Sequence, residues 1–439
     1  MRLTLLSRIG LLVLACCLMP QLTEAEPEET DARSRILLPD SVEKAFPEAL
    51  AEIRDSALRI VPNMTIEVVV ETSSQIGADK RCAWFHSAEI QAYGLRTGND
   101  AAIICTTSPE GALYGLSQLE SIWLKGPVGD LQIETQPAFD RRALHFVVRH
   151  VTAQQFREII LRARLARFNT LVLMMTDGIA FRSFPGKVRK DAISPDLLSS
   201  LCDEARGNGL SIVAEVKLLT HQQVFLQDSH PELMFNKVTY DPRKSAVYDL
   251  VSAYIDEVVA TVEPVAINIG HDEVKGIGVA SRKRSLNSGE NPLPAPLFLQ
   301  DVITLRHMLV SRGLQVWMWG DMLLPKSLLP EVLQRSWDER QEYPDLLDRI
   351  PKDIVINDWH YFDERDFPSA DYFDAHGFRV MGATWYDREA TKAFSTYLAN
   401  RKWHAAGMVA TTWSLIPQGK WGQAFDLIET SGEAFWDGR

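Results

Sequence analysis

The chain has 439 residues, of which 46% are hydrophobic and 24% are charged, so it can bury a sizeable core and is not expected to be disordered. Its formal net charge of −12 argues against a grip on nucleic acid or anionic lipid through charge. Neither its length nor its composition sets an oligomeric state.

The N-terminus has the pattern of an export signal. Arg2 and Arg8 supply positive charge, the apolar run "IGLLVLACCLMP" (9–20) is too short to span a bilayer, and "TEA" ends at Ala25. We therefore predict a signal peptide over 1–25 and an exported protein, periplasmic or extracellular, without a stable membrane span. Lipoprotein anchoring at Cys16, within "VLAC", and an uncleaved signal anchor are the alternatives.

Residues 26–137 predict a small α+β domain without catalytic residues. The run "MTIEVVVE" (64–71) is dense in β-branched residues and predicts a strand. The segment "SPEGALYGLSQLESIW" (108–123) begins with a Ser cap and a first-turn Pro, which predicts a helix.

Three cysteines lie outside the predicted signal, namely Cys82, Cys105 and Cys202. Cys82 and Cys105 flank parts of the small domain and could form a disulfide, but buried thiols are the reading that we favour. The cysteines show no spacing typical of a zinc site.

Residues 138–439 alternate short apolar runs with periodic helical segments. The apolar runs are "ALHFVV" (143–148), "TLVLMM" (170–175), "SIVAEV" (211–216), "VAINIG" (265–270), "QVWMWG" (315–320), "IVINDW" (354–359), "RVMGATW" (379–385) and "GMVATTW" (407–413). Eight such units are typical of a (β/α)8 TIM barrel. A doubly wound open sheet is the alternative, but the first run lacks the Gly-rich turn that it would carry.

Polar and aromatic residues follow these runs, where a TIM barrel builds its active site. The fourth run ends in Asp272 and Glu273, and the last four runs each deliver a tryptophan, at Trp319, Trp359, Trp385 and Trp413. Aromatic walls with carboxylates suit a carbohydrate, and glycosidic cleavage needs a proton donor and a second group that stabilises charge.

Other readings of the acid pair remain open. One carboxylate could face the pocket while the other forms a structural salt bridge, because neighbouring side chains in a regular strand point to opposite faces. A metal site at His271, Asp272 and Glu273 is disfavoured, since consecutive residues converge poorly on one ion. We expect no cofactor.

Several fragments, in order, resemble glycoside hydrolase family 20, the β-N-acetylhexosaminidase group. The most specific, "NIGHDEV" (268–274), is similar to the family motif H-I-G-G-D-E-V. Weaker similarities lie in "SPEGALYGLSQL" (108–119), "RALHFVVRH" (142–150), "MTDGIAFR" (175–182), "VAEVKLLTH" (213–221) and "YDPRKSAVYDLV" (240–251).

The resemblance implies a retaining mechanism in which the substrate's own 2-acetamido group attacks the anomeric carbon. It assigns the general acid and base to Glu273 and the orientation of the acetamido group to Asp272. It assigns the walls of the pocket to Trp319, Trp359 and Trp413, and a hydrogen bond to the acetamido carbonyl oxygen to Tyr386. Contacts with sugar hydroxyls are implied for Arg142 (or Arg141), Asp177 and Asp387, His221 matches the family histidine near the acid, and Trp385 is a further substrate-binding candidate.

The chain also departs from the family pattern. The first-strand Asp is absent from "HFVVRH", and an Asp, an Asp, a His and a Gly of the family motifs are replaced by Gly178, Lys217, Asn268 and His271. Ser414 follows Trp413 where a Glu is common. Such partners hold catalytic groups in place, and we expect Lys217 to lower the pKa of Glu273 and to weaken it as a proton donor.

The leading hypothesis is therefore an exported hydrolase that removes terminal N-acetylhexosamine (GlcNAc or GalNAc) from a glycan. A carbohydrate-binding pseudoenzyme that keeps the tryptophan walls without turnover is the alternative from another class. A barrel hydrolase with two conventional catalytic carboxylates is a third candidate, and it should accept substrates that lack the acetamido group.

Overall fold

The computed structural model describes residues 34–98, 100–126, 129–275, 285–328, 343–401 and 405–439. The predicted signal peptide and Cys16 lie outside these residues. Within the described part, none of the helices combines the length and the apolar character needed to cross a bilayer.

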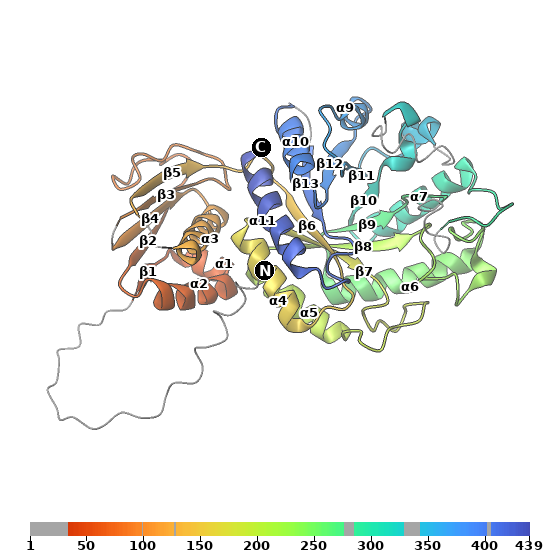
Figure 1. Cartoon of the computed structure of the whole chain (residues 1–439), viewed down its shortest axis with the longest axis horizontal. Helices are drawn as coiled ribbons and strands as arrows, with labels where there is room; N and C mark the ends of the chain where they lie inside the picture. Colours follow the sequence, from red (N-terminus) through yellow and green to blue (C-terminus); the bar gives the residue numbers. More distant parts are fainter. Residues whose placement is uncertain (1–33, 99, 127–128, 276–284, 329–342, 402–404) are drawn as a thin grey trace, which may run out of the picture.

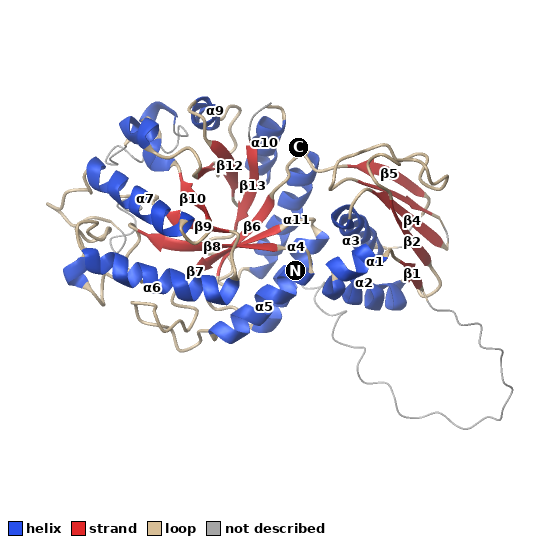
Figure 2. Ribbon diagram, turned by 180° about the vertical axis from the view of Figure 1, so that it is seen from behind, coloured by secondary structure: helices blue, strands red, loops and turns tan. Residues whose placement is uncertain are grey.

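The N-terminal part contains a five-stranded mixed sheet in the order β1-β2-β4-β3-β5. Its strands are β1 (Arg35–Leu37), β2 (Thr65–Val70), β3 (Tyr93–Thr97), β4 (Ala101–Thr106) and β5 (Leu131–Thr135). Helices α1 (Asp40–Ala45), α2 (Pro47–Ile60) and α3 (Pro109–Lys125) lie between this sheet and the rest of the molecule (Figures 1 and 2). The predicted strand at 64–71 and helix at 108–123 both form.

The predicted cap explains where α3 begins. The Ser108 hydroxyl accepts a hydrogen bond from the Gly111 backbone amide at 3.0 Å, and Pro109 occupies the first helical position. A Ser cap satisfies one of the free amides of the first turn, and proline loses nothing there because its missing N–H would have no partner within the helix.

Eight parallel strands close into a barrel, in the order β10-β11-β12-β13-β6-β7-β8-β9, as predicted. They are β6 (Arg142–Val147), β7 (Thr170–Met175), β8 (Ser211–Leu218), β9 (Ala266–Gly270), β10 (Gln315–Trp319), β11 (Val355–Trp359), β12 (Arg379–Thr384) and β13 (Ala405–Thr411). Each corresponds to one of the apolar runs. The carboxyl ends of all eight strands therefore share one rim.

Helices surround the barrel (Figure 2). They are α4 (Ala153–Leu165), α5 (Pro195–Gly207), α6 (Ser245–Val262), α7 (Ala295–Val310), α9 (Pro368–Ala375), α10 (Arg388–Ala399) and α11 (Trp421–Asp437), with 3₁₀ turns at Pro231–Leu233, Asp321–Leu323, Lys326–Leu328 and Pro344–Arg349. Apolar side chains between strands and helices form the largest core cluster.

The two parts of the chain share a buried interface. Arg164 of α4 donates to Glu120 of α3 at 2.6 Å, and the Ser56 hydroxyl of α2 donates to the other oxygen of Glu120 at 2.7 Å. Trp436 of α11 belongs to the core of the N-terminal part, where its ring contacts Tyr93 and Tyr114. Because a buried charge pair and a large aromatic join them, the two parts are held as one body.

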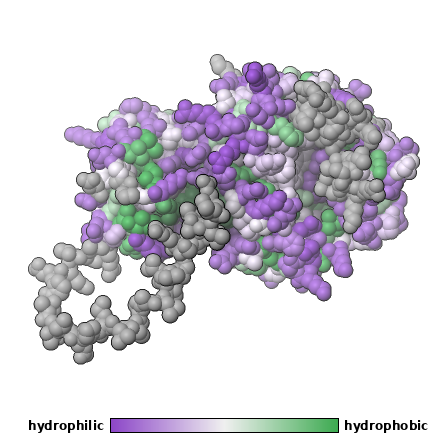
Figure 3. All heavy atoms as spheres, viewed as in Figure 1, coloured by the Kyte–Doolittle hydropathy of each residue, from purple (hydrophilic) through white to green (hydrophobic). Residues whose placement is uncertain are grey.

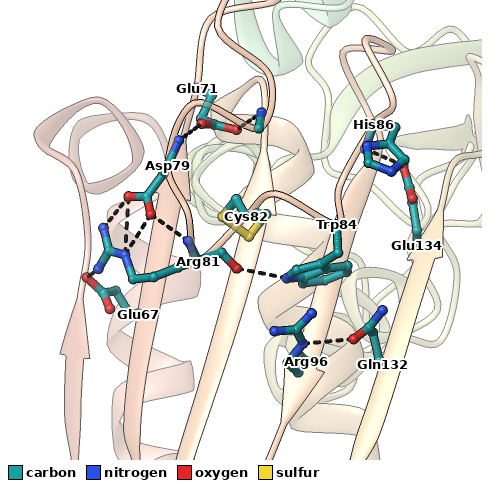
Figure 4. The surroundings of a disulfide bond; sticks show 12 residues. Glu67, Glu71, Asp79, Arg81, Cys82, Trp84, His86, Arg96, Gln132 and Glu134 are labelled. Atoms are coloured by element: carbon teal, nitrogen blue, oxygen red, sulfur yellow. Dashed lines mark hydrogen bonds and ion pairs between the residues drawn. A yellow bond between two sulfur atoms is a disulfide. The ribbon is translucent and has the colours of Figure 1, made fainter.

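A disulfide crosses the outer side of the N-terminal sheet. Cys82 and Cys105 are bonded, so the expectation of two free thiols is wrong, whereas Cys202 is free and buried. The bond ties the segment between β2 and β3 to β4 (Figure 4). The same segment is held by backbone amides that donate to Glu71, and by the Trp84 indole, which donates to a backbone carbonyl at 2.8 Å.

The surface differs between the two parts on the side shown in Figure 3. Hydrophilic residues cover most of the visible barrel, while hydrophobic residues gather on the N-terminal part. The large exposed hydrophobic residues there include Leu37, Ile90 and Leu124. The barrel therefore presents a polar face to solvent in this view.

The disulfide predicts a measurable contribution to stability. Replacing Cys82 and Cys105 by Ser should lower the free energy of unfolding by about 2–4 kcal/mol, because the open chain gains conformational freedom when unfolded. Denaturant unfolding of both proteins measures the difference. The Cys202→Ala variant, which removes a thiol without opening a loop, is the control, and equal stability of wild type and the double Ser variant would contradict the prediction.

Candidate active site

The acid pair lies in a turn whose backbone departs from a regular strand. Strand β9 ends at Gly270 (φ 79°), and both His271 (φ 70°) and Glu273 (φ 54°) adopt left-handed conformations. This turn breaks the strand alternation, so Asp272 and Glu273 both reach His221, whose Nε2 lies 3.2 Å from Asp272 Oδ2 and 3.5 Å from Glu273 Oε2. Non-glycine residues in this region are uncommon and concentrate at functional sites.

His271 anchors this turn from behind. Its imidazole is fully buried, and its Nε2 lies 3.0 Å from Asp301 Oδ2 of helix α7. The hydroxyls of Tyr240 and Tyr248 donate to the same carboxylate at 2.9 and 2.7 Å. His271 thus ties the acid-bearing turn to the surrounding helices.

Lys217 is the central cation of the site. Its Nζ lies 3.0 Å from Glu215 Oε1 and 3.1 Å from Asp272 Oδ2, and its side chain is 11% exposed. It also lies over the rings of Trp413 and Trp319, at 5.1 and 5.8 Å from their centroids. Of the two neighbouring acids, Asp272 is therefore the one with which the lysine forms an ion pair.

These contacts determine the charge states. Burial alone would raise the pKa of Asp272, but Lys217 and His221 outweigh it and hold that pKa well below its ordinary value. Burial likewise opposes ionisation of Glu215, and Lys217 and His145 lower its pKa in spite of it. Burial would lower the pKa of Lys217, yet the two carboxylates raise it. Asp272 and Glu215 are therefore carboxylates, and Lys217 is an ammonium.

Glu273 is the more accessible of the two acids. Its side chain is 16% exposed, and its backbone amide donates to Asp321 Oδ2 at 3.1 Å, just beyond strand β10. Asp321 thereby supports the turn from the next strand.

Aromatic side chains from neighbouring strands form one connected wall. The rings of Trp319 and Trp413 are 5.5 Å apart, and Trp359 stacks on Tyr361 at 4.9 Å. The Trp413 indole donates to the Tyr361 hydroxyl at 2.9 Å, and Tyr361 contacts Trp385 edge-on. The rim tryptophans predicted from the sequence are thus brought together. Trp317 and Trp319 are both buried inside the barrel, and the partly exposed Trp359 and Trp413 pack against this cluster.

Sequence reasoning missed Tyr361, which links these tryptophans. Burial raises its pKa, as do the nearby carboxylates of Asp272 and Glu215, so its hydroxyl remains protonated. Its position two residues after Trp359, just past the end of β11, was the available signal.

Asp177 lies on the rim as predicted, but its partner is Arg149. Arg149 Nε donates to Asp177 Oδ1 at 2.7 Å, joining the ends of β6 and β7. A cavity of about 820 Å³ opens beside Asp177, between the loops that follow β7 and β8, and the residues that line it include neither Asp272 nor Glu273 and none of the rim tryptophans. Its lining includes Arg189, Asp191 and Phe225.

Arg142 is not at the rim, so its assignment to the substrate is wrong. It begins strand β6, and the site lies where the strands end. Its guanidinium is fully buried, donates to the Arg167 and Phe139 carbonyls at 2.8 and 2.7 Å, and lies over the Trp436 ring. Counting along the strand places Arg149, seven residues later, at the correct end. The alternative, Arg141, lies over the ring of the buried Trp317 and is no closer to the rim.

Tyr386 and Asp387 lie at the edge of the site. Tyr386 is 56% exposed and packs on Trp385. Asp387 caps helix α10 by accepting a hydrogen bond from the Ala390 amide at 3.0 Å. A capping carboxylate explains Asp387 without a ligand, and the contact of Tyr386 with a substrate remains a prediction.

One cluster in the described chain has the spacing of a metal site. Ligand atoms of His221, Asp272 and Glu273 lie within 4.8 Å of one another. Lys217 already places a positive charge against Asp272, which opposes a second cation there. We assign no ligands here.

Comparison with solved structures identifies the fold. A chitobiase from Flavobacterium johnsoniae is 16% identical, with a TM-score of 0.64 over 92% of this chain and 66% of that chain. A family 20 β-N-acetylhexosaminidase from Streptomyces coelicolor A3(2) is 14% identical, with a TM-score of 0.65 over 92% and 87%. A family 20 exo-β-N-acetylglucosaminidase from Vibrio harveyi, solved with N-acetylglucosamine, is 14% identical, with a TM-score of 0.64 over 92% and 70%.

The chain thus has the fold of the family 20 hexosaminidases, as its motifs predicted. No protein-family profile matches it, and neither does any curated protein sequence. At this level of identity the likeness concerns the fold.

The contrast between Arg149 and Arg142 gives a prediction. Arg149→Met should weaken glycan binding at least ~10-fold while changing stability by about 1 kcal/mol or less, because its ion pair is partly exposed. Arg142→Met should lower stability by about 3 kcal/mol or more, since it removes hydrogen bonds from a buried interface. Calorimetric titration with N-acetylglucosamine oligomers and thermal unfolding measure both effects. If Arg142→Met weakened glycan binding without loss of stability, while Arg149→Met left binding unchanged, Arg142 would be the residue that contacts the substrate.

Proposed function

We propose that the protein is an exported glycoside hydrolase that removes terminal N-acetylhexosamine, GlcNAc or GalNAc, from a glycan. The observation that carries this proposal is the joint placement of Asp272 and Glu273 on His221, at the carboxyl end of β9 and on the same rim as the tryptophan wall. An acid pair beside aromatic faces is the equipment that glycosidic cleavage requires.

Glu273 acts as the general acid. Its carboxyl, the more exposed of the pair, protonates the oxygen of the leaving group. In the same step the bond between the anomeric carbon and the leaving group breaks, and the oxygen of the substrate's 2-acetamido group attacks that carbon to form a cyclic oxazolinium. Glu273, now a carboxylate, then takes a proton from the water that opens this ring, and the configuration is retained.

Asp272 orients the acetamido group. A carboxylate can accept a hydrogen bond from the acetamido N–H and balance the positive charge of the oxazolinium, whereas a neutral acid does this poorly. Lys217 and His221 keep Asp272 ionised, which supports this assignment. Trp319, Trp359 and Trp413 supply the faces against which the ring and its acetyl group pack.

Export is supported by the disulfide. A bond between Cys82 and Cys105 suits an oxidising compartment, in agreement with the predicted signal peptide. Periplasmic or extracellular glycans are then the available substrates, whether or not Cys16 carries a lipid.

A carbohydrate-binding pseudoenzyme is the second candidate, and one contact favours it. Both oxygens of Asp272 accept from Lys217, at 3.2 and 3.1 Å, so the acetamido group must share an acceptor that is already occupied. Measurable binding of N-acetylglucosamine oligomers without any release of nitrophenol from aryl N-acetylhexosaminides would identify this case.

The role of Glu273 predicts a dependence on the leaving group. Glu273→Gln should lower kcat/KM by about 10²–10⁴-fold for substrates with poor leaving groups, because they need a proton, and by less for nitrophenyl glycosides. Steady-state hydrolysis of both kinds of substrate measures the split. Glu263→Gln is the matched control, since Glu263 also has left-handed backbone (φ 43°) but lies at the end of α6. Equal losses for both substrates would reject Glu273 as the acid.

The role of Asp272 predicts loss of discrimination. Asp272→Asn should lower kcat/KM by about 10²-fold or more on N-acetyl substrates, because an uncharged side chain stabilises the oxazolinium poorly, and should narrow the preference for N-acetyl over 2-hydroxy sugars. Rates on matched aryl glycosides measure this. Asp358→Asn, which also removes a buried partner of a histidine, His360, is the control. Unchanged rate and preference would rule out the proposed role.

A further inference from the structure

Lys217 stands where the similar family motif has an acid, and it connects more of the site than any other side chain described there. On its own strand it pairs with Glu215 at 3.0 Å, and on the next strand with Asp272 at 3.1 Å. It also lies over the faces of Trp319 and Trp413, which come from β10 and β13. One ammonium thus contacts groups from four strands.

The backbone of β8 is irregular next to Lys217. The pairing of β8 with β9 shifts between Glu215 and Leu218, so β8 contains an irregularity at Lys217. Past the irregularity Gly270 pairs with Leu218, and a Cβ added to it would lie 3.5 Å from the Leu218 backbone and 3.6 Å from the Lys217 Cα. The left-handed φ of 79° at this position suits glycine. Irregularities of this kind redirect side chains near active sites.

Without this lysine, Asp272 would be harder to ionise. The groups that face it or its partners are Lys217 and Glu215 from β8, His221 from the next loop, Glu273 beside it, Tyr361 after β11, and His145 of β6, which lies 3.3 Å from Glu215. Among them Lys217 is the cation whose charge does not depend on pH in the working range. Removing it leaves Asp272 buried beside the negative charge of Glu215.

We propose that Lys217 is a positioning residue that holds Asp272 as a carboxylate and fixes it against the tryptophan wall. Its part in catalysis rests on the proposed function, whereas its effect on Asp272 does not. Lys217 touches no reacting atom. It keeps the orienting carboxylate available at acidic pH, where a glycosidase whose acid is a carboxyl group retains its proton.

The decisive experiment follows the Asp272 carboxyl directly. Aspartate labelled with ¹³C at the carboxyl is introduced, and the Asp272 resonance is identified by its absence from Asp272→Asn. In the wild type this resonance should not titrate between about pH 4 and pH 8, because the pKa lies lower. In Lys217→Met it should titrate within that range, at least ~1 pH unit above the ordinary value of about 3.9.

Two further variants control for unfolding of Lys217→Met and for the general effect of removing a lysine. The double variant Lys217→Met with Glu215→Gln removes both members of one ion pair. It should stay folded even if the single variant unfolds because the Glu215 charge is left buried without a partner. In the double variant Asp272 should still titrate at higher pH than in the wild type. Lys352→Met is the matched control, because Lys352 also lies over an aromatic ring, that of Phe378, on another part of the barrel. It should leave the Asp272 resonance unchanged.

Turnover gives the second readout. Relative to pH 7, kcat at pH 5 on an N-acetyl substrate should fall at least ~2-fold further in Lys217→Met than in the wild type, because about half of Asp272 or more is then protonated and cannot serve as the acceptor. An Asp272 that stays ionised in both Lys217 variants overturns the proposal. If the wild type shows no turnover but the Asp272 resonance behaves as expected in all variants, the proposed function is rejected. The effect of Lys217 on Asp272 is then still established.

Discussion

Glu215 and Asp272 are buried on neighbouring strands of a closed barrel, and the Lys217 ammonium lies between them. Removing two carboxylates from water costs several kcal/mol each unless a partner offsets the loss. The rest of the site depends on this pairing, because it fixes the charge of Asp272 and places a cation against Trp413. With a lysine between two buried acids, the chain keeps Asp272 ionised.

The opposite end of the barrel is specialised for holding the chain together. Arg142 and Trp436 meet below the strands, and Arg164 joins α4 to α3 through Glu120. All are buried, and none contacts the rim. Stability and chemistry are thus separated along the strands, which is how TIM barrels divide their two faces. The small N-terminal part contributes to the first of these tasks.

Much of this arrangement could be predicted from the sequence, since runs that alternate between apolar and helical periodicity encode strand order and strand ends. The acid pair and the rim tryptophans follow from that rule alone. Arg142 was misassigned because the motif similarity was given more weight than the direction of the strand. Arg142 begins β6, so it lies at the end of the barrel opposite the site. The choice between a disulfide and two thiols depended on the path of the loop that carries Cys82, which short-range patterns do not contain. Tyr361 was missed although its position just past β11 was a signal, because only residues at the ends of the apolar runs were considered.

Backbone conformation adds a last constraint that no pattern of side chains reveals. Within the described residues, eight non-glycine residues have left-handed backbone, and six of them follow strands β6, β8, β9 and β13: His150, Leu219, His221, His271, Glu273 and Trp413. Each such residue costs about 1–3 kcal/mol, so it persists only where surrounding contacts impose it. At β9 those contacts are the buried His271–Asp301 pair and the Asp321 bond to the Glu273 amide. The helices behind the rim therefore stabilise the strained turn that directs both acids toward one histidine, and the departure at His271 becomes part of the support for the site.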